Sequence, residues 1–121
     1  MSDPRQVVLV TGAARRVGRA IAVHLAGCGY DVAVHFHRSE ELARETAGLC
    51  VARGARAPLF GADLSDPSNA DRLVDRVLAS LGRVDALVNS AAVMVATPLR
   101  TVTAAQWDLV FAVNLRAPFF L

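Results

Sequence analysis

The sequence predicts an α/β fold in which a doubly wound parallel sheet carries helices on both faces. Four consecutive apolar residues, 7–10, form a run typical of a strand that is buried on both sides. Gly12 and Gly18 follow this run, and apolar residues then recur at helical spacing, at Val17, Ile21 and Leu25. Strand-like and helix-like segments continue to alternate along the chain, which is the pattern of parallel α/β folds.

Glycines delimit the first helix and the second strand. The spacing predicts a helix over about 16–26 that stops at Gly27 or Gly29, because glycine readily adopts the left-handed conformation that ends helices. Residues 31–36 are expected to form the second strand, with Val32, Ala33 and Val34 at its centre.

The second helix is expected to begin after Ser39, whose hydroxyl can cap it. Glu40 and Glu41 in its first turn would complement the helix dipole, and Gly54 would end it. The residues of this second helix that should face the sheet are Leu42, Thr46, Leu49 and Cys50. Residues 57–61 are expected to form the third strand.

A third helix is predicted over 68–81, closing at Gly82, followed by a fourth strand over 84–89. The expected apolar face of this third helix consists of Leu73, Val74, Val77, Leu78 and Leu81. A fourth helix should start at Thr103, because Thr103 and Gln106 match a capping box.

The predicted element order is β-α-β-α-β-α-β-α. Right-handed crossovers then arrange the strands in the order 3-2-1-4. In such a sheet the ligand crevice lies at the carboxyl ends of strands one and four, where the order reverses.

Composition narrows the class of protein. With 121 residues, 54% hydrophobic, the chain is long enough for one domain with a large core. A net charge of +2 with scattered arginines does not favour nucleic-acid binding. No apolar run approaches the roughly 18 residues of a membrane span, and no signal peptide is evident. We expect a cytoplasmic protein without a metal site, in which Cys28 and Cys50 are buried thiols.

The turn between Gly12 and Gly18 is a candidate phosphate site. A helix N-terminus offers unpaired N–H groups and a partial positive charge, and glycine lets the backbone approach a pyrophosphate closely. An ordinary strand–helix turn with chance glycines would carry the same residues.

The segment after the second strand is basic where a nucleotide site could need an acid. Sites that prefer NAD place a carboxylate about 20 residues after the glycines, to bind the ribose hydroxyls. Here that region contains no acid before Glu40, and instead holds His35, His37, Arg38 and Ser39. With Arg15 or Arg16 from the turn, it predicts a pocket that favours NADP(H). The alternative is that these polar side chains simply solvate a loop.

The turn that begins at Thr11 and Gly12 resembles the T-G-x-x-x-G-x-G turn of the short-chain dehydrogenase/reductase (SDR) family, with Arg16 at the middle glycine and Val17 before Gly18. The T-G-A-A-R-R-V-G turn and the H-F-H-R-S segment are similar to those of its pteridine reductase-like branch. The resemblance implies a partial Rossmann-type sheet and NADP(H) as cofactor.

The resemblance also implies roles for later residues. Asp63 would bind the adenine amino group and Leu64 would pack on the ring, although Asp63 could instead cap a turn. The segment Asn89, Ser90 and Ala91 would run along the ribose. Asn114 matches the helix asparagine of the family's catalytic tetrad, whereas an isolated asparagine in a helix is usually solvated or bonded to its own backbone.

The family's catalytic Ser and Tyr-x-x-x-Lys are not found in the sequence. Tyr30 is its only tyrosine and it has no lysine. We therefore expect residues 1–121 to be the NADP(H)-binding half of an SDR domain, truncated before these groups and inactive alone. The whole protein would be a homo-oligomer that transfers hydride to a C=O or C=N bond of a small molecule, with a pteridine or dihydrofolate-like compound as one candidate. A non-catalytic NADP(H)-binding module and a general SDR acting on a ketone or alcohol are the alternatives.

Overall fold

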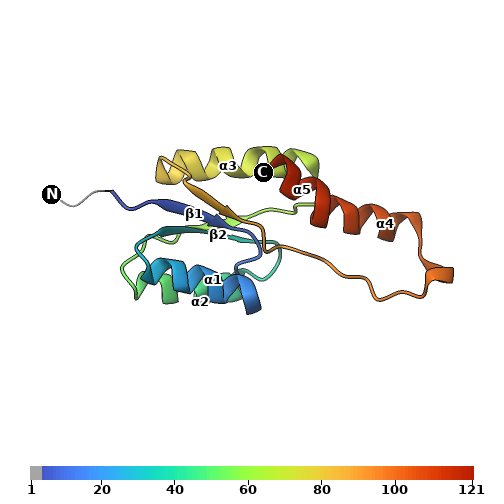
Figure 1. Cartoon of the computed structure of the whole chain (residues 1–121), viewed down its shortest axis with the longest axis horizontal. Coiled ribbons are helices and arrows are strands. Elements are labelled where there is room, and N and C mark those ends of the chain that lie inside the picture. The colour runs from blue at the N-terminus through green and yellow to red at the C-terminus, as the bar shows by residue number, and fades with distance from the viewer. Residues whose placement is uncertain (1–3) are drawn as a thin grey trace.

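The computed structural model describes residues 4–121 and has a four-stranded parallel sheet between two layers of helices (Figure 1). In chain order its elements are β1 (Val7–Val10), α1 (Arg16–Gly27), β2 (Asp31–Phe36), α2 (Glu40–Val51), β3 (Leu59–Gly61), α3 (Pro67–Leu81), β4 (Ala86–Val88), the 3-10 turn η1 (Leu99–Thr101), α4 (Ala104–Phe111), the π-helical segment η2 (Ala112–Arg116) and α5 (Ala117–Phe120). The strand order is β3-β2-β1-β4, which confirms the predicted order. Helices α1 and α2 cover one face of the sheet, while α3 and α5 pack on the other.

Strand β1 lies inside the sheet, paired with β2 on one side and β4 on the other. Its side chains are all fully buried, but they point alternately to the two faces. Val8 and Val10 join the core under α1 and α2, whereas Val7 and Leu9 join the core under α3 and α5. A strand covered on both faces needs no polar side, which explains its continuous apolar sequence.

The helix caps mostly follow the sequence. Thr103 and Gln106 form the predicted capping box, with each side chain accepting a hydrogen bond from the other residue's backbone N–H. Gly82 ends α3 with a φ of 82°. Helix α3 starts at Pro67, one residue earlier than predicted, because the Asp66 carboxylate accepts the Ser68 N–H at 2.9 Å and proline suits the first helical position. Ser39 precedes α2 as expected, but its side chain makes no capping hydrogen bond.

Three predicted burials are wrong. Leu49 and Leu78 are 46% and 42% exposed, respectively. Each lies one residue beside a fully buried one, Cys50 or Val77, and a helix turns by about 100° per residue, so both fall at the edge of the buried face. Cys28 is exposed because it follows the last turn of α1, whereas Cys50 is buried in α2 as expected; both thiols are free.

Strands β3 and β4 are shorter than the predicted 57–61 and 84–89. Each pairs with a single neighbour, β3 with the end of β2 and β4 with β1, and the pairing sets their lengths. Similarly, α1 runs through Gly27, and Gly29 takes the left-handed conformation, with a φ of 102°.

The last helical stretch changes its winding. Helix α4 continues into η2 and α5, and the Ala117 N–H bonds to the Ala112 carbonyl, five residues earlier, as in a π-helix. A π turn accommodates an extra residue, and nothing in the sequence pattern predicted it. Within residues 4–121, no helix has both the length and the apolar character needed to cross a bilayer.

Asp31 anchors the end of the sheet where the strands begin. Its side chain is 2% exposed and is paired with Arg5 at 3.1 Å and with Arg56 at 2.8 Å. The Arg56 backbone N–H adds a further bond at 2.8 Å. Burial by itself would raise the pKa of Asp31, but these hydrogen bonds and the two positive charges hold that pKa below its usual value.

We expect Asp31→Asn to lower the free energy of unfolding by about 1–3 kcal/mol at pH 7, because Arg5 and Arg56 lose their charged partner. Since the pKa of Asp31 is lower in the folded state, its contribution is complete above the unfolded pKa of about 3.9 and is lost as the pH falls through the folded value. In urea unfolding between pH 7 and about pH 3, the difference in unfolding free energy between the wild type and Asp31→Asn should therefore become smaller as the pH falls.

Asp71→Asn on the exposed side of α3 is the control, and it should leave the unfolding midpoint nearly unchanged at both ends of the range. If the difference in unfolding free energy between the wild type and Asp31→Asn stays constant in acid, the charge of Asp31 does not stabilise the sheet as described.

Candidate functional site

A cleft of about 480 Å³ opens at the carboxyl ends of the strands, where the sequence places the ligand crevice. Segments that follow each of the four strands line it. The sequence-predicted residues in its wall are Gly12, Arg15, Arg16, Val17, Gly18, His35, His37, Arg38, Ser39, Asp63, Leu64, Ser90 and Ala91. Thr11, Asn89 and Asn114 are not part of the wall.

The turn after β1 leaves no room for side chains at its two glycines. Gly12 has a φ of 62°, and a Cβ atom there would lie 2.8 Å from the Cα atom of Ala91. A Cβ atom on Gly18 would lie 2.0 Å from the carbonyl oxygen of Gly12. Between them, Arg16 is the one non-glycine among the described residues with a positive φ, 53°. It therefore occupies a backbone position that glycine would hold with less strain.

Thr11 braces the turn from behind. It is buried, and its hydroxyl oxygen accepts the backbone N–H groups of Ser90 and Ala91, each at 3.0 Å. Its own N–H donates to the carbonyl of Val88 at 3.0 Å. These bonds hold the segment after β4 against the turn, and they explain why Thr11 supports the cleft without lining it.

The N-terminus of α1 opens toward this turn. Arg15 occupies the N-cap position in an extended conformation and makes no side-chain capping bond, and the first turn contains no acidic residue. First-turn N–H groups without a cap are ready to bind an anion. Arg15 and Arg16 are both exposed beside them and add positive charge.

The loops after β2 and β3 meet on the other side of the cleft. His37 and Arg38 are exposed, and the Nε2 atom of His37 lies 3.8 Å from the Asp63 carboxylate. Asp63 accepts the hydroxyl and backbone N–H of Ser65 at 2.7 and 2.9 Å, and these bonds hold its pKa below the usual value. Asp63 thus closes a turn, as the simpler interpretation proposed, while one carboxylate oxygen faces His37. Leu64 is almost fully buried, in the core under α3.

The imidazole of His35 has a different position from the one the sequence suggested. The side chain is 2% exposed, and its two ring nitrogens contact the N–H of Gly12 and the carbonyl of Ala62. Burial lowers its pKa. His35 lines the cleft, but its polar atoms bind the protein's own backbone, so the basic groups left to face a phosphate there are His37 and Arg38.

Asn114 clamps the segment that follows β4. Its side chain accepts the Val93 N–H and donates to the Val93 carbonyl, both at 2.8 Å. It is therefore neither only solvated nor bonded to its own helix. The cleft-lining residues that sequence reasoning missed, Ala14, Phe36, Ala62, Ala92, Val93 and Val113, are all neighbours of the predicted ones and carry no polar side chain that could have signalled them.

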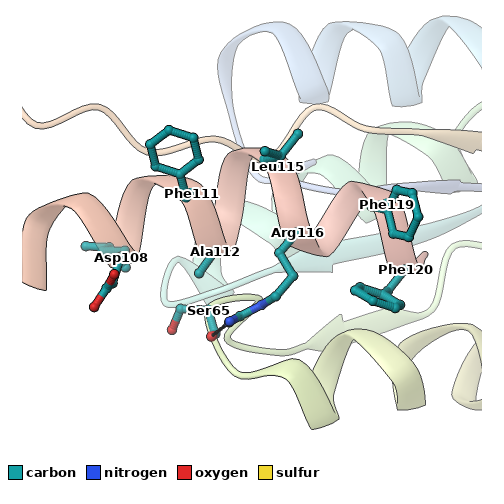
Figure 2. A pocket seen from close by; sticks show the side chains of 9 residues that line it. Ser65, Asp108, Phe111, Ala112, Leu115, Arg116, Phe119 and Phe120 are labelled. Atoms are coloured by element: carbon teal, nitrogen blue, oxygen red, sulfur yellow. Dashed lines mark hydrogen bonds between the residues drawn. The ribbon is translucent and has the colours of Figure 1, made fainter.

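A second hollow of about 760 Å³ lies along α4 and α5 (Figure 2). Its wall is mainly apolar, and Phe119 and Phe120 are 80% and 60% exposed. Arg116 crosses it and donates to the carbonyl of Ser65 at 2.6 Å (Figure 2). Across residues 4–121 no three His, Cys, Asp or Glu side chains gather in a way that could hold a metal ion.

Gly18→Ala should lower the free energy of unfolding by more than about 3 kcal/mol, because its Cβ atom would have to displace the backbone of the turn. Gly48→Ala is a matched control in α2, where no atom lies within 4 Å of the added Cβ, and it should raise that free energy by about 0.5–1 kcal/mol. Thermal unfolding followed by circular dichroism compares the two, and equal shifts would contradict this account of the turn.

Comparison with known proteins gives the family. The model of the short chain dehydrogenase family matches residues 6–121. L-2,3-butanediol dehydrogenase of Corynebacterium glutamicum is 37% identical over 116 residues, which are 95% of this chain and 45% of the relative. A hydroxynaphthalene reductase-like protein of Metarhizium majus is 36% identical and covers 96% of this chain and 43% of its own length.

Solved structures agree. A short chain dehydrogenase from Burkholderia cenocepacia in complex with NADP superposes with a TM-score of 0.92 at 38% identity, over 98% of this chain and 49% of that one. A metagenomic short-chain oxidoreductase in complex with NADP superposes with a TM-score of 0.88 at 41% identity, over 96% of this chain and 52% of that one. The chain thus spans about half the length of the proteins it matches. The relatives carry the names of several different dehydrogenases and reductases. None of those names identifies the pteridine reductase-like branch. The chain belongs to the short-chain dehydrogenase/reductase family.

Proposed function

We propose that the chain is the dinucleotide-binding part of an NADP(H)-dependent oxidoreductase. The observation that carries the proposal is the charge of the cleft, where Arg15, Arg16, His37 and Arg38 gather and the loop after β2 offers no carboxylate before Glu40. A 2′-phosphate is the group that distinguishes NADP(H) from NAD(H), and guanidinium groups bind phosphate with charge-assisted hydrogen bonds.

The residues of the cleft fit such a ligand. The uncapped N-terminus of α1 and the glycine turn would take the pyrophosphate. Arg38, with His37 and Ser39, would take the 2′-phosphate, and Asp63 with Leu64 the adenine. Asn89, Ser90 and Ala91 would lie along the ribose, where Thr11 holds the last two in place. When bound, the nicotinamide would supply or accept the hydride.

The chain's own contribution to the reaction is binding and orientation. The sequence contains no lysine, and its one tyrosine, Tyr30, lies at the opposite end of the sheet, where its carbonyl accepts a hydrogen bond from Arg5. The Tyr-x-x-x-Lys pair that the family uses is therefore not among the residues of this cleft, and we expect residues 1–121 alone to bind cofactor without turnover. Asn114 would act by holding Val93 and its neighbours at the cleft's edge.

For the substrate we infer a ketone or secondary alcohol of a small molecule, reduced or oxidised at carbon. The names of the relatives, a butanediol dehydrogenase and hydroxynaphthalene reductases, support this class. A pteridine or dihydrofolate-like compound, reduced at C=N, remains the second candidate because Arg16 replaces a glycine at a left-handed position beside the cleft. Turnover of a ketone and a pterin by the whole protein would decide between them, and cofactor binding with neither activity would favour a non-catalytic module.

We further propose that the protein works in the cytoplasm and as a homo-oligomer. Both cysteines are free thiols, which suits a reducing compartment. The exposed apolar side chains along α4 and α5 suit a surface that is covered in an assembly.

Calorimetric titration of the chain with NADPH and NADH tests the cofactor. We expect the wild type to bind NADPH at least about tenfold more tightly, and Arg38→Asp to weaken NADPH binding by about 30-fold, since one charged hydrogen bond contributes roughly 1.5–3 kcal/mol. NADH binding should change much less.

Arg44→Asp is the matched control, because Arg44 pairs with Glu40 on the exposed side of α2, outside the cleft. It should leave the NADPH-to-NADH ratio unchanged within about threefold. If Arg38→Asp also leaves the ratio unchanged, the 2′-phosphate pocket does not exist; if a folded wild type binds neither dinucleotide, the proposed function is wrong.

A further inference from the structure

His35 stands at the end of β2 with both ring nitrogens engaged by backbone groups of two different loops. The N–H of Gly12 donates to Nδ1 at 3.0 Å, and Nε2 lies 2.9 Å from the carbonyl oxygen of Ala62. A carbonyl oxygen can only accept, so Nε2 carries the hydrogen and Nδ1 presents its lone pair. The two bonds therefore select the neutral imidazole in one tautomer.

The two loops that the ring joins lie at different parts of the cleft. Gly12 opens the turn that leads to the N-terminus of α1, the proposed pyrophosphate position. Ala62 directly precedes Asp63 and Leu64, the proposed adenine position. The β2 backbone bonds to each loop separately, through Ala13 N–H to the His35 carbonyl at 2.9 Å and Ala62 N–H to the Phe36 carbonyl at 3.0 Å. The imidazole adds a side-chain link that spans both loops at once.

We propose that His35 is a positioning residue whose neutral imidazole acts as a strut, fixing the spacing between the pyrophosphate turn and the adenine loop so that both ends of the dinucleotide are bound in one geometry. This inference rests on the proposed function and deepens it. The strut needs an acceptor at Nδ1 and a donor at Nε2, and only a neutral ring provides both. The ring itself is buried, so its effect on the ligand passes through the two backbone groups.

The surroundings of the ring favour this neutral form. The charged or titratable groups that share its cleft or act on it are Arg15 and Arg16 in the turn, His37 and Arg38 after β2, Asp63 after β3 and Arg76 on α3. Burial lowers the pKa of His35, and the positive charges of His37 and Arg76 act in the same direction against the opposing effect of the Ala62 bond. A second proton would have to occupy Nδ1, where it would displace the Gly12 N–H.

Two conservative variants separate the halves of the strut. In His35→Asn the amide oxygen can occupy the place of Nδ1 and accept the Gly12 N–H. In His35→Gln the amide nitrogen can occupy the place of Nε2 and donate to Ala62, but no acceptor remains for Gly12. Calorimetric titration with NADP⁺ and the amide exchange rate of Gly12, measured by NMR, are the two readouts. His24→Asn and His24→Gln, on the exposed side of α1, are the matched controls.

We expect His35→Asn, which cannot reach Ala62, and His35→Gln, which cannot accept the Gly12 N–H, each to bind NADP⁺ about tenfold more weakly than the wild type. Gly12 amide exchange should be accelerated about tenfold only in His35→Gln. The two His24 variants should match the wild type. An NADP⁺ affinity within about threefold of the wild type in either His35 variant, or Gly12 amide exchange that is equally fast in both, would overturn the strut while leaving the proposed function intact. Absence of NADP⁺ binding by the folded wild type would overturn both.

Discussion

The close approach of three backbone segments at the carboxyl end of the sheet is the constraint on which the rest of the structure depends. The carbonyl of Gly12 lies where a Cβ atom of Gly18 would be, and the other side of Gly12 faces Ala91 in the segment after β4. This contact directs the N-terminus of α1 toward the cleft and limits how far apart the segments after β1 and β4 can lie. The buried hydroxyl of Thr11 contributes directional bonds to the same junction. Steric fit and hydrogen bonding thus specify one geometry for the turn.

The sheet uses charge differently at its two ends. Where the strands begin, the buried carboxylate of Asp31 is matched by Arg5 and Arg56 and serves the fold. Where the strands end, arginines and His37 are exposed around the cleft, and Asp63 is the one acidic residue in its wall within residues 4–121. An excess of unpaired positive charge is unfavourable for the isolated protein but suits a ligand with several phosphates. The charged groups around Asp31 thus stabilise the fold, whereas those around the cleft are the groups proposed to bind the cofactor.

Much of this arrangement could be predicted because it follows from local patterns. The strand order follows from alternating elements and right-handed crossovers, and the capping box follows from two residues three positions apart. The position of His35 could not be predicted in this way. Strand β2 is buried on both faces, so the alternation that normally tells an inward residue from an outward one is absent.

Long-range pairs were also beyond the sequence pattern. Asn114 and Val93 are 21 residues apart, and Asn114 lies in a π-helical segment that no local signal marks. Leu49 and Leu78 were also predicted to be buried but are exposed. Helical spacing locates the buried face of a helix only to within about one residue, or roughly 100° of rotation. Elements and motifs therefore follow from the sequence, whereas the contacts between them depend on how those elements pack in three dimensions.

The anchor at Asp31 has a consequence for how such a protein can change over evolutionary time. It lies where the strands begin and shares no partner with Arg38, and substitutions at well-separated sites usually add without coupling. If Arg38 binds the 2′-phosphate as proposed, a lineage could exchange the residue at position 38, and with it the preferred coenzyme, without losing the stability that the Asp31 anchor supplies. On that proposal, we expect coenzyme preference to vary more among chains that keep this fold than the buried ion pairs of Asp31 do.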